Sequence, residues 1–321
     1  MADPCIICNN VNNNIQYNVK ELQLGLNEEF IYQLCSNCGS TQLVNVPANL
    51  GKYYPNEGYY SFNMQLKTAK KPDLLRKIKT DYLLFGRHAF LGKLLSIGYK
   101  INELYEWVKY TGAKYEDAIL DVGTGNGSLL TRLHQIGFKN LTGIDPFINE
   151  SREFNHIRIL KKNVFETEGL YDVIMMHHSL EHVLNPKETL KRVYDILKPG
   201  GKALIRVPIM GNYGWKTYGT YWCGLDAPRH IFIPSEKGIK QLVKEAGFII
   251  DKFYYDSYAF IIICSEQYKK NVAQYASNSY LVNPSKSLFT KADIKRFNKI
   301  MIEENKNNNG DMAAIYLSKP L

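Results

Sequence analysis

Residues 121–127 read Asp-Val-Gly-Thr-Gly-Asn-Gly, and this stretch decides the fold. An apolar run at 118–122 predicts a strand, and residues 128–136 carry apolar side chains at helical spacing. Glycines let a backbone approach a ligand closely, and the start of a helix presents free N–H groups. We therefore expect a ligand to bind over a turn that joins a strand to a helix.

Strand-like and helix-like stretches alternate beyond this turn. The strand-like stretches are 141–144, 171–176, 202–207 and 312–317, and the helix-like ones are 187–197 and 236–246. This alternation predicts an α/β protein with a parallel sheet wrapped by helices. The chain has 321 residues, of which 45% are hydrophobic and 22% charged, which suits one large α/β domain with additions and excludes a disordered or fibrous protein.

The glycine turn departs from the pattern that binds dinucleotides, because Ser128 stands where that pattern needs its third glycine. Asp121, two residues before the first glycine, suits a cationic ligand better than a pyrophosphate. Asp145 ends the next predicted strand, where a carboxylate can hold the two hydroxyls of a ribose. Together these features favour an adenosyl ligand without phosphates over a purely structural turn.

Two Cys-x-x-Cys pairs stand near the N-terminus and are typical of a zinc ribbon. Disulfide bonds between these cysteines are the alternative interpretation. Residues 1–10 lack a basic-then-apolar leader, and no apolar run approaches the ~20 residues of a membrane span, so we expect a cytoplasmic, reducing compartment. Four thiolates fill a tetrahedral zinc site, so the ion should stabilise the fold without entering the chemistry. The expected ligands are Cys5, Cys8, Cys35 and Cys38.

Residues 119–127 resemble the first motif of the class I S-adenosylmethionine-dependent methyltransferases. The resemblance covers residues 115–320 and implies a Rossmann-like sheet of seven strands. Gly58-Tyr59-Tyr60 and the cysteine pairs are similar to members that act in surface-polysaccharide and modified-sugar pathways. Further matching segments are Tyr171-Asp-Val-Ile174, the Leu180-Glu-His182 signature, Leu197-Lys-Pro-Gly-Gly201, Trp222 to His230 and Glu245-Ala-Gly-Phe248.

The resemblance implies a site for S-adenosylmethionine at the carboxyl ends of the strands. An acidic residue that the family often uses near the adenine is absent at residues 163–164. The implied cofactor contacts are Asp121, Gly123, Gly125 and Gly127 for the amino acid part, Asp145 for the ribose, Asn163 and Val164 for the adenine, and His177 at the end of the fourth strand.

Methyl transfer to a hydroxyl needs a base beside the sulfonium, and a neutral histidine is the commonest base at neutral pH. We expect His230 to be this base, His178 to line the same site, and Asp226 to orient the imidazole. Arg229 is expected to pair with a phosphate or carboxylate of the acceptor. The alternative is that Arg229 and Asp226 only tie their loop together. Tyr59, Tyr60 and Tyr221 are candidates to stack on a sugar.

His178 and His182 are spaced like a pair of metal ligands on a helix. In metalloproteases, however, glutamate follows the first histidine directly, whereas Glu181 here precedes the second one. We therefore interpret Glu181 and His182 as a structural pair beneath the pocket.

The domains expected are a zinc-binding ribbon at 1–50, a helical cover at 51–114, and a class I methyltransferase domain at 115–321 with a helical insertion at about 257–306. The function expected is methyl transfer from S-adenosylmethionine to a nucleotide-linked or polysaccharide sugar. Methylation of RNA is the alternative, consistent with the net charge of +9, although the ribbon holds one base against four acids. A non-catalytic scaffold in which the ribbon recruits a partner is a further alternative.

Overall fold

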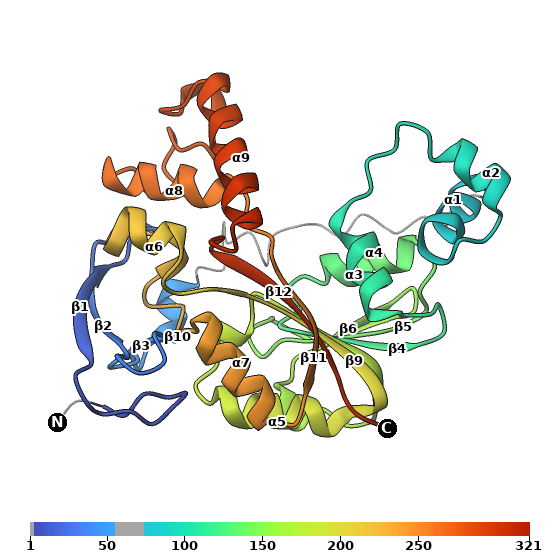
Figure 1. Ribbon diagram of the computed structural model, residues 1–321, viewed down its shortest axis with the longest axis horizontal. Helices are drawn as coiled ribbons and strands as arrows, with labels where there is room; N and C mark the ends of the chain where they lie inside the picture. The colour runs from blue at the N-terminus through green and yellow to red at the C-terminus, as the bar shows by residue number, and fades with distance from the viewer. Residues whose placement is uncertain (1–2, 55–73) are drawn as a thin grey trace.

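The computed structural model describes residues 3–54 and 74–321. Within this part of the chain, the central sheet has eight strands in the order β11-β12-β9-β8-β4-β5-β7-β6 (Figure 1). The strands are β4 (Ala118–Val122), β5 (Asn140–Ile144), β6 (Arg152–Phe154), β7 (Ile157–Leu160), β8 (Tyr171–His177), β9 (Leu197–Pro208), β11 (Ile249–Tyr255) and β12 (Met312–Ser318).

Strands β4, β5, β7, β8 and β9 are parallel, as the alternation of strands and helices predicts. Strand β12 runs antiparallel to both of its neighbours, β9 and β11. The sequence predicted seven strands, and the eighth is β6, which forms a hairpin with β7. Asn155 and His156 make this hairpin turn with φ values of 47° and 65°. Two left-handed residues are what a tight two-residue hairpin needs, but Asn-His is a weak sequence signal for one.

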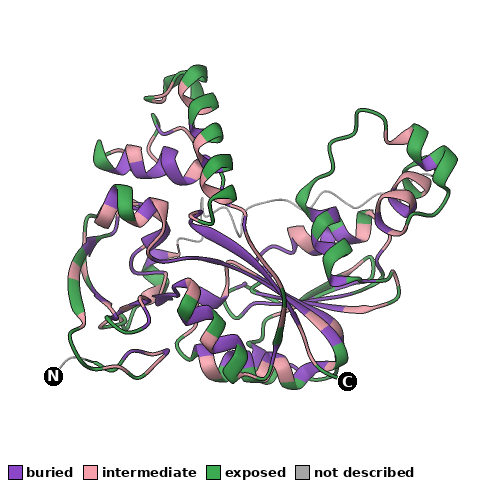
Figure 2. Ribbon diagram, in the orientation of Figure 1, coloured by how far each residue is buried: buried purple, intermediate pink, exposed green. Residues whose placement is uncertain are grey.

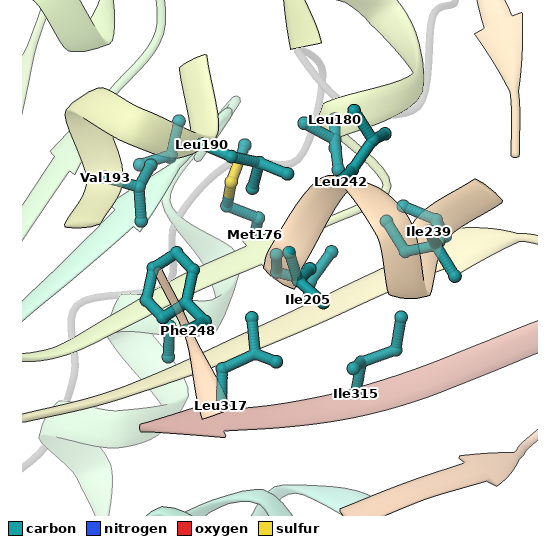
Figure 3. Packing of buried hydrophobic residues seen from close by; sticks show 14 of the residues in the cluster. Met176, Leu180, Leu190, Val193, Ile205, Ile239, Leu242, Phe248, Ile315 and Leu317 are labelled. Carbon is teal, nitrogen blue, oxygen red and sulfur yellow. The ribbon is translucent and has the colours of Figure 1, made fainter. Parts of the chain in front are cut away.

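Helices cover both faces of the sheet because successive residues of each buried strand point to opposite sides. On one face, Ile205 and Ile315 pack against Leu190 of α5 and Leu242 of α7 (Figure 3). On the other face, Leu204 packs with residues of α3 and α4. The helices are α1 (Leu74–Phe85), α2 (Ala89–Leu95), α3 (Glu103–Thr111), α4 (Ser128–Gln135), α5 (Pro186–Ile196), α6 (Tyr213–Tyr218), α7 (Glu236–Glu245), α8 (Phe260–Lys269) and α9 (Lys291–Lys306).

The N-terminal segment forms a second, four-stranded sheet of order β1-β2-β3-β10. Its last strand is contributed by a segment far along the chain, because Phe232 pairs with Gln42 and Ile233 with Thr41. The ribbon is therefore joined to the loop that follows β9 (Figure 1). These strands are β1 (Ile15–Lys20), β2 (Glu29–Leu34), β3 (Thr41–Leu43) and β10 (Phe232–Ile233).

Short 3-10 turns occupy several of the connections between these elements. Burial is greatest in the strands of the central sheet, whereas α1, α2 and α9 carry much of the exposed surface (Figure 2). Among the described residues, no helix is both long and apolar enough to cross a membrane. The 3-10 turns are η1 (Leu50–Tyr53), η2 (Val164–Glu166), η3 (Leu180–His182), η4 (Gly219–Tyr221), η5 (Cys223–Leu225) and η6 (Pro284–Lys286).

Candidate active site

The glycine turn lies between β4 and α4 and needs glycine for two reasons. Gly123, Gly125 and Gly127 have φ values of 79°, 52° and 77°, a left-handed conformation that side chains disfavour. A Cβ atom on Gly123 would also lie only 2.4 Å from Cβ of Ser179, at the end of β8. The turn therefore brings the carboxyl ends of β4 and β8 into direct contact.

Two buried carboxylates stand beside this turn, and among the described residues neither forms a salt bridge. Burial raises the pKa of Asp121 to about 7, although a hydrogen bond with Thr124 works against this rise. Burial also raises the pKa of Asp145, although hydrogen bonds from the N–H groups of Phe147 and Gly125 lower it in part. These N–H groups lie 2.8 and 3.0 Å from the Asp145 carboxylate oxygens. Each oxygen keeps a second acceptor position, so the residue fits ribose hydroxyls.

Several buried polar atoms at the end of β8 lack a hydrogen-bond partner among the described residues. They are Oγ of Ser179 and both ring nitrogens of His177. The ring of His177 packs on Trp107, with the ring centroids 4.3 Å apart, and burial holds its pKa well below the usual value. Buried polar atoms are normally hydrogen-bonded, so these atoms fit a polar ligand bound over the turn.

Asn163 and Val164 lie at the start of η2. The Asn163 side chain accepts hydrogen bonds from the N–H groups of Phe165 and Glu166, at 2.9 and 3.2 Å, and so caps the turn. Val164 is buried. The cap fixes the backbone that follows β7, but contact of this pair with adenine stays a prediction.

A cleft of about 390 Å³ opens beside the end of β8. It brings together three of the residues predicted for catalysis, His178, Asp226 and His230. Tyr221 is exposed and is not among the lining residues, while Tyr59 and Tyr60 lie outside the described residues. Other lining residues include Gln23, Glu181, His182, Cys223, Tyr258, Phe260 and Gln274.

The two predicted histidines face a common carboxylate, that of Glu181. Nδ1 of His178 lies 3.3 Å from Oε1 of Glu181, and Nε2 of His230 lies 3.9 Å from the same oxygen. Nε2 of His230 also lies 3.7 Å from Oδ2 of Asp226. Burial alone would raise the pKa of Glu181, but the contact with His178 and the charges of the other histidines outweigh it and lower this pKa.

Arg229 is fully buried beside the cleft, where its guanidinium joins two segments of the chain. Its Nη2 donates to Asp226 at 2.6 Å and to Glu21 of the ribbon at 3.2 Å, and Nη1 donates to the carbonyl oxygen of Tyr53 at 3.1 Å. Burial would raise the pKa of Asp226, but the charge of Arg229 holds it below the usual value. This geometry favours the loop-tying alternative over contact of Arg229 with an acceptor.

Sequence reasoning missed Tyr54 as a residue of this region. Its ring stacks on that of Phe147, two residues after Asp145, with centroids 5.6 Å apart and planes 8° apart. Its hydroxyl lies 3.1 Å from Nδ1 of His182. Nothing in the local sequence distinguishes Tyr54 from the other tyrosines, because this contact depends on where the ribbon meets the central sheet.

The four N-terminal cysteines converge as the ribbon pattern predicts. The Sγ atoms of Cys5 and Cys38 are 3.6 Å apart, those of Cys8 and Cys35 are 3.5 Å apart, and all four lie within 4.8 Å of one another. A tetrahedral zinc ion with Zn–S bonds of ~2.3 Å has sulfur atoms about 3.8 Å apart, so the cluster is compatible with one zinc ion. The backbone N–H of Cys38 points to Sγ of Cys35 at 3.5 Å, as expected in a metal-binding turn.

The sheet with its reversed strand β12, together with the glycine turn, defines a Rossmann-like class I methyltransferase fold. Residues 96–252 match the family model described as a methyltransferase domain. This match covers just under half of the chain, within the segment that forms the class I methyltransferase fold.

The chain is similar to curated methyltransferases that act on different acceptors. It is 27% identical over 164 residues to tRNA U34 carboxymethyltransferase of Helicobacter acinonychis, covering 45% of this chain and 60% of that protein. It is 33% identical over 102 residues to ubiquinone biosynthesis O-methyltransferase of Shewanella pealeana, covering 28% of this chain and 43% of that protein. Among solved structures, it is similar to the cyclopropane synthase MmaA2 of Mycobacterium tuberculosis, with 14% identity, a TM-score of 0.46 and coverage of 76% and 93%.

Proposed function

We propose that this protein transfers a methyl group from S-adenosylmethionine to a small acceptor bound in the cleft beside β8. The observation that carries the proposal is the set of unpaired polar groups around the glycine turn. Asp121 and Asp145 form no salt bridge among the described residues, and Ser179 and His177 offer polar atoms without partners there. A cationic ligand with ribose hydroxyls satisfies both the charge and the hydrogen bonds.

When bound, S-adenosylmethionine would supply a methyl group on a sulfonium to an acceptor oxygen. The oxygen–carbon bond would form as the carbon–sulfur bond breaks, with its electron pair staying on the sulfur of S-adenosylhomocysteine. The walls of the cleft hold the acceptor and exclude water, which supplies much of the rate in such displacements. The hydroxyl proton passes to an imidazole of the cleft, for which His178 and His230 are the candidates.

His178 is the better placed of the two imidazoles. Its contact with Glu181 is made through Nδ1, which leaves Nε2 for the acceptor, and the side chain is one-third exposed. The side chain of His230 is only 12% exposed, and its Nε2 is directed at Glu181 and Asp226.

We further propose that the acceptor is a sugar. The volume of the cleft suits a small molecule rather than a macromolecule, since ligand pockets span ~300–1,000 Å³. RNA is the second candidate, favoured by the similarity to a tRNA-modifying enzyme. Against RNA, the ribbon as a whole, residues 1–50, holds one base against four acids.

Calorimetry with S-adenosylhomocysteine tests the cofactor assignment. Asp145→Asn should weaken binding at least tenfold, because the amide has one accepting oxygen where the carboxylate has two. Asp251→Asn is the matched control, since this exposed carboxylate pairs with Lys202 and should leave affinity unchanged. Absence of binding by the parent protein would instead support the scaffold alternative.

Transfer of a labelled methyl group into cell extracts, separated into RNA, protein, glycan and small-molecule fractions, tests the acceptor. Label in the glycan or small-molecule fraction supports the sugar proposal, and label in RNA overturns it.

A further inference from the structure

The carboxylate of Glu181 is the most isolated charged group in the cleft. Its side chain is completely buried, and within the described ranges its carboxylate has no backbone N–H, lysine or arginine partner. The imidazole nitrogens that face it belong to His178 and His230, 3.3 and 3.9 Å from Oε1. A buried carboxylate whose partners are imidazoles alone is costly when those rings are neutral, so this oxygen pair calls for a cation.

The two neighbouring imidazoles have their ring orientations fixed by backbone carbonyl groups. Nδ1 of His182 lies 2.8 Å from the carbonyl oxygen of Arg229, and Nδ1 of His230 lies 2.8 Å from that of Gly224. A carbonyl oxygen only accepts, so the proton of each neutral ring sits on Nδ1 and the lone pair is on Nε2. Histidines that bind metals through Nε2 are held in this way by their Nδ1–H groups.

The buried residues around Glu181 carry more negative than positive charge. The guanidinium of Arg229 is shared between Asp226 and Glu21, so this one cation already faces two carboxylates. With neutral imidazoles, Glu181 adds a third negative charge to the same buried layer. The cluster therefore has the charge, the lone pairs and the access from the cleft that a cation needs.

We propose that Glu181, His182 and His230 bind a first-row divalent transition-metal ion at the base of the cleft. One ligand atom from each residue lies within 4.8 Å of the others, which a small movement of the side chains brings to metal-binding distance. Two imidazoles and one carboxylate suit Zn²⁺, Co²⁺, Fe²⁺ or Mn²⁺, whereas Mg²⁺ prefers oxygen ligands. The remaining coordination positions face the cleft.

The use of this ion in methyl transfer rests on the proposed function, but binding of the ion does not. An acceptor oxygen coordinated there would be held in place and made more acidic, since a bound cation stabilises the oxyanion. The proton would then go to His178, whose Nδ1 contacts the same carboxylate oxygen, Oε1 of Glu181, that His230 faces. In this arrangement His230 is a metal ligand rather than the base that the sequence predicted.

Metal binding to the full-length protein tests the site without any acceptor. Protein whose cysteine cluster is filled with zinc is freed of loosely bound metal and titrated with Co²⁺, followed by visible absorption and by metal analysis. The parent protein should take up one further equivalent, with the spectrum of nitrogen and oxygen ligands and not that of four thiolates. Glu181→Gln and His230→Gln should weaken this uptake at least about 100-fold, since loss of groups that merely support the ligands already costs ~10–100-fold.

His156→Gln serves as the matched control, because this exposed histidine lies in the β6–β7 hairpin and should leave Co²⁺ uptake unchanged. Calorimetry with S-adenosylhomocysteine reports whether each variant remains folded. Uptake of no further equivalent by the parent, or equal uptake by folded Glu181→Gln protein, overturns the proposal and indicates that protonated histidines balance Glu181. If the protein binds the cofactor but no further metal ion, the metal proposal fails and the proposed function stands. If it binds the further ion but not the cofactor, the proposed function fails and the metal proposal stands.

Discussion

Replacement of Arg229 by Met separates a structural from a substrate-binding role. Arg229→Met keeps a side chain of similar length but removes the cation between Asp226 and Glu21. Asp226 loses contacts of 2.6 and 3.1 Å, while Glu21 keeps the N–H groups of Leu24 and Leu26 at 2.8 and 3.0 Å. Asp226 should therefore account for most of the effect.

The magnitude follows from the burial of this network. Removal of one partner from a buried ion pair costs ~3–5 kcal/mol, because the remaining charge has no compensation. The guanidinium is completely inaccessible, so solvent cannot replace it. We expect the free energy of unfolding of Arg229→Met to fall by about 3–5 kcal/mol. Arg229→Met combined with Asp226→Asn should recover part of this loss, because the buried negative charge is then gone as well.

Urea unfolding followed by tryptophan fluorescence measures this loss, and the buried Trp222 lies in the same core cluster as Ala227. Lys202→Gln is the control, since the pair of Lys202 with Asp251 is over one-third exposed and should contribute less than ~1 kcal/mol. A variant as stable as the parent, with a raised KM for the acceptor, would refute the structural role and restore Arg229 as an acceptor contact.

Three other perturbations address the zinc cluster, a buried acid and the glycine turn. A chelator under reducing conditions should lower the apparent melting temperature by releasing the ribbon, and an unchanged melting curve would contradict a structural zinc. Burial raises the pKa of Asp311 to about 7, above its value of 3.8 in an unfolded chain. Between these pH values only the unfolded state loses the proton, so stability falls as pH rises. From pH 5 to pH 8 this fall is up to about 3 kcal/mol, and Asp311→Asn should remove it in urea unfolding measured at these two pH values. Gly123→Ala should abolish binding of S-adenosylhomocysteine, because the added Cβ would clash with Ser179. Gly169→Ala is the control, since Gly169 also has a positive φ but its added Cβ would meet no atom within 4 Å, and it should leave binding unchanged. Equal losses in both variants would mean that backbone strain, and not the clash with Ser179, causes the effect.

The features that sequence predicted well are those with a local signature. The glycine turn, the strand 118–122 and the cysteine pairs each depend on residues a few positions apart, and each is found in the structure as expected. The hairpin of β6 was missed because its turn residues, Asn155 and His156, lack the glycine that normally marks such a turn.

The surroundings of the site depended on contacts that no local pattern carries. Arg229 is 208 positions from Glu21, and β10 joins a sheet whose other strands end at Leu43. An arginine in a polar loop usually remains exposed, so only the position of the ribbon shows that this one is buried. The same contacts explain why Glu181, interpreted from sequence as a structural residue, lies in the cleft.

The ribbon contributes to the site chiefly by holding the loop that carries His230. The hydroxyl of Tyr32 donates to the carbonyl oxygen of His230 at 2.7 Å, and the N–H of Ser235 donates to Oγ of Ser40 at 2.9 Å. These contacts flank β10 on both sides, so the ribbon fixes the backbone of His230 while lying outside the methyltransferase sheet. A metal that stabilises the ribbon therefore stabilises the position of an imidazole in the cleft, although none of its four cysteines lines that cleft. Zinc in this protein would then be structural for the fold and, through β10, a condition for the chemistry.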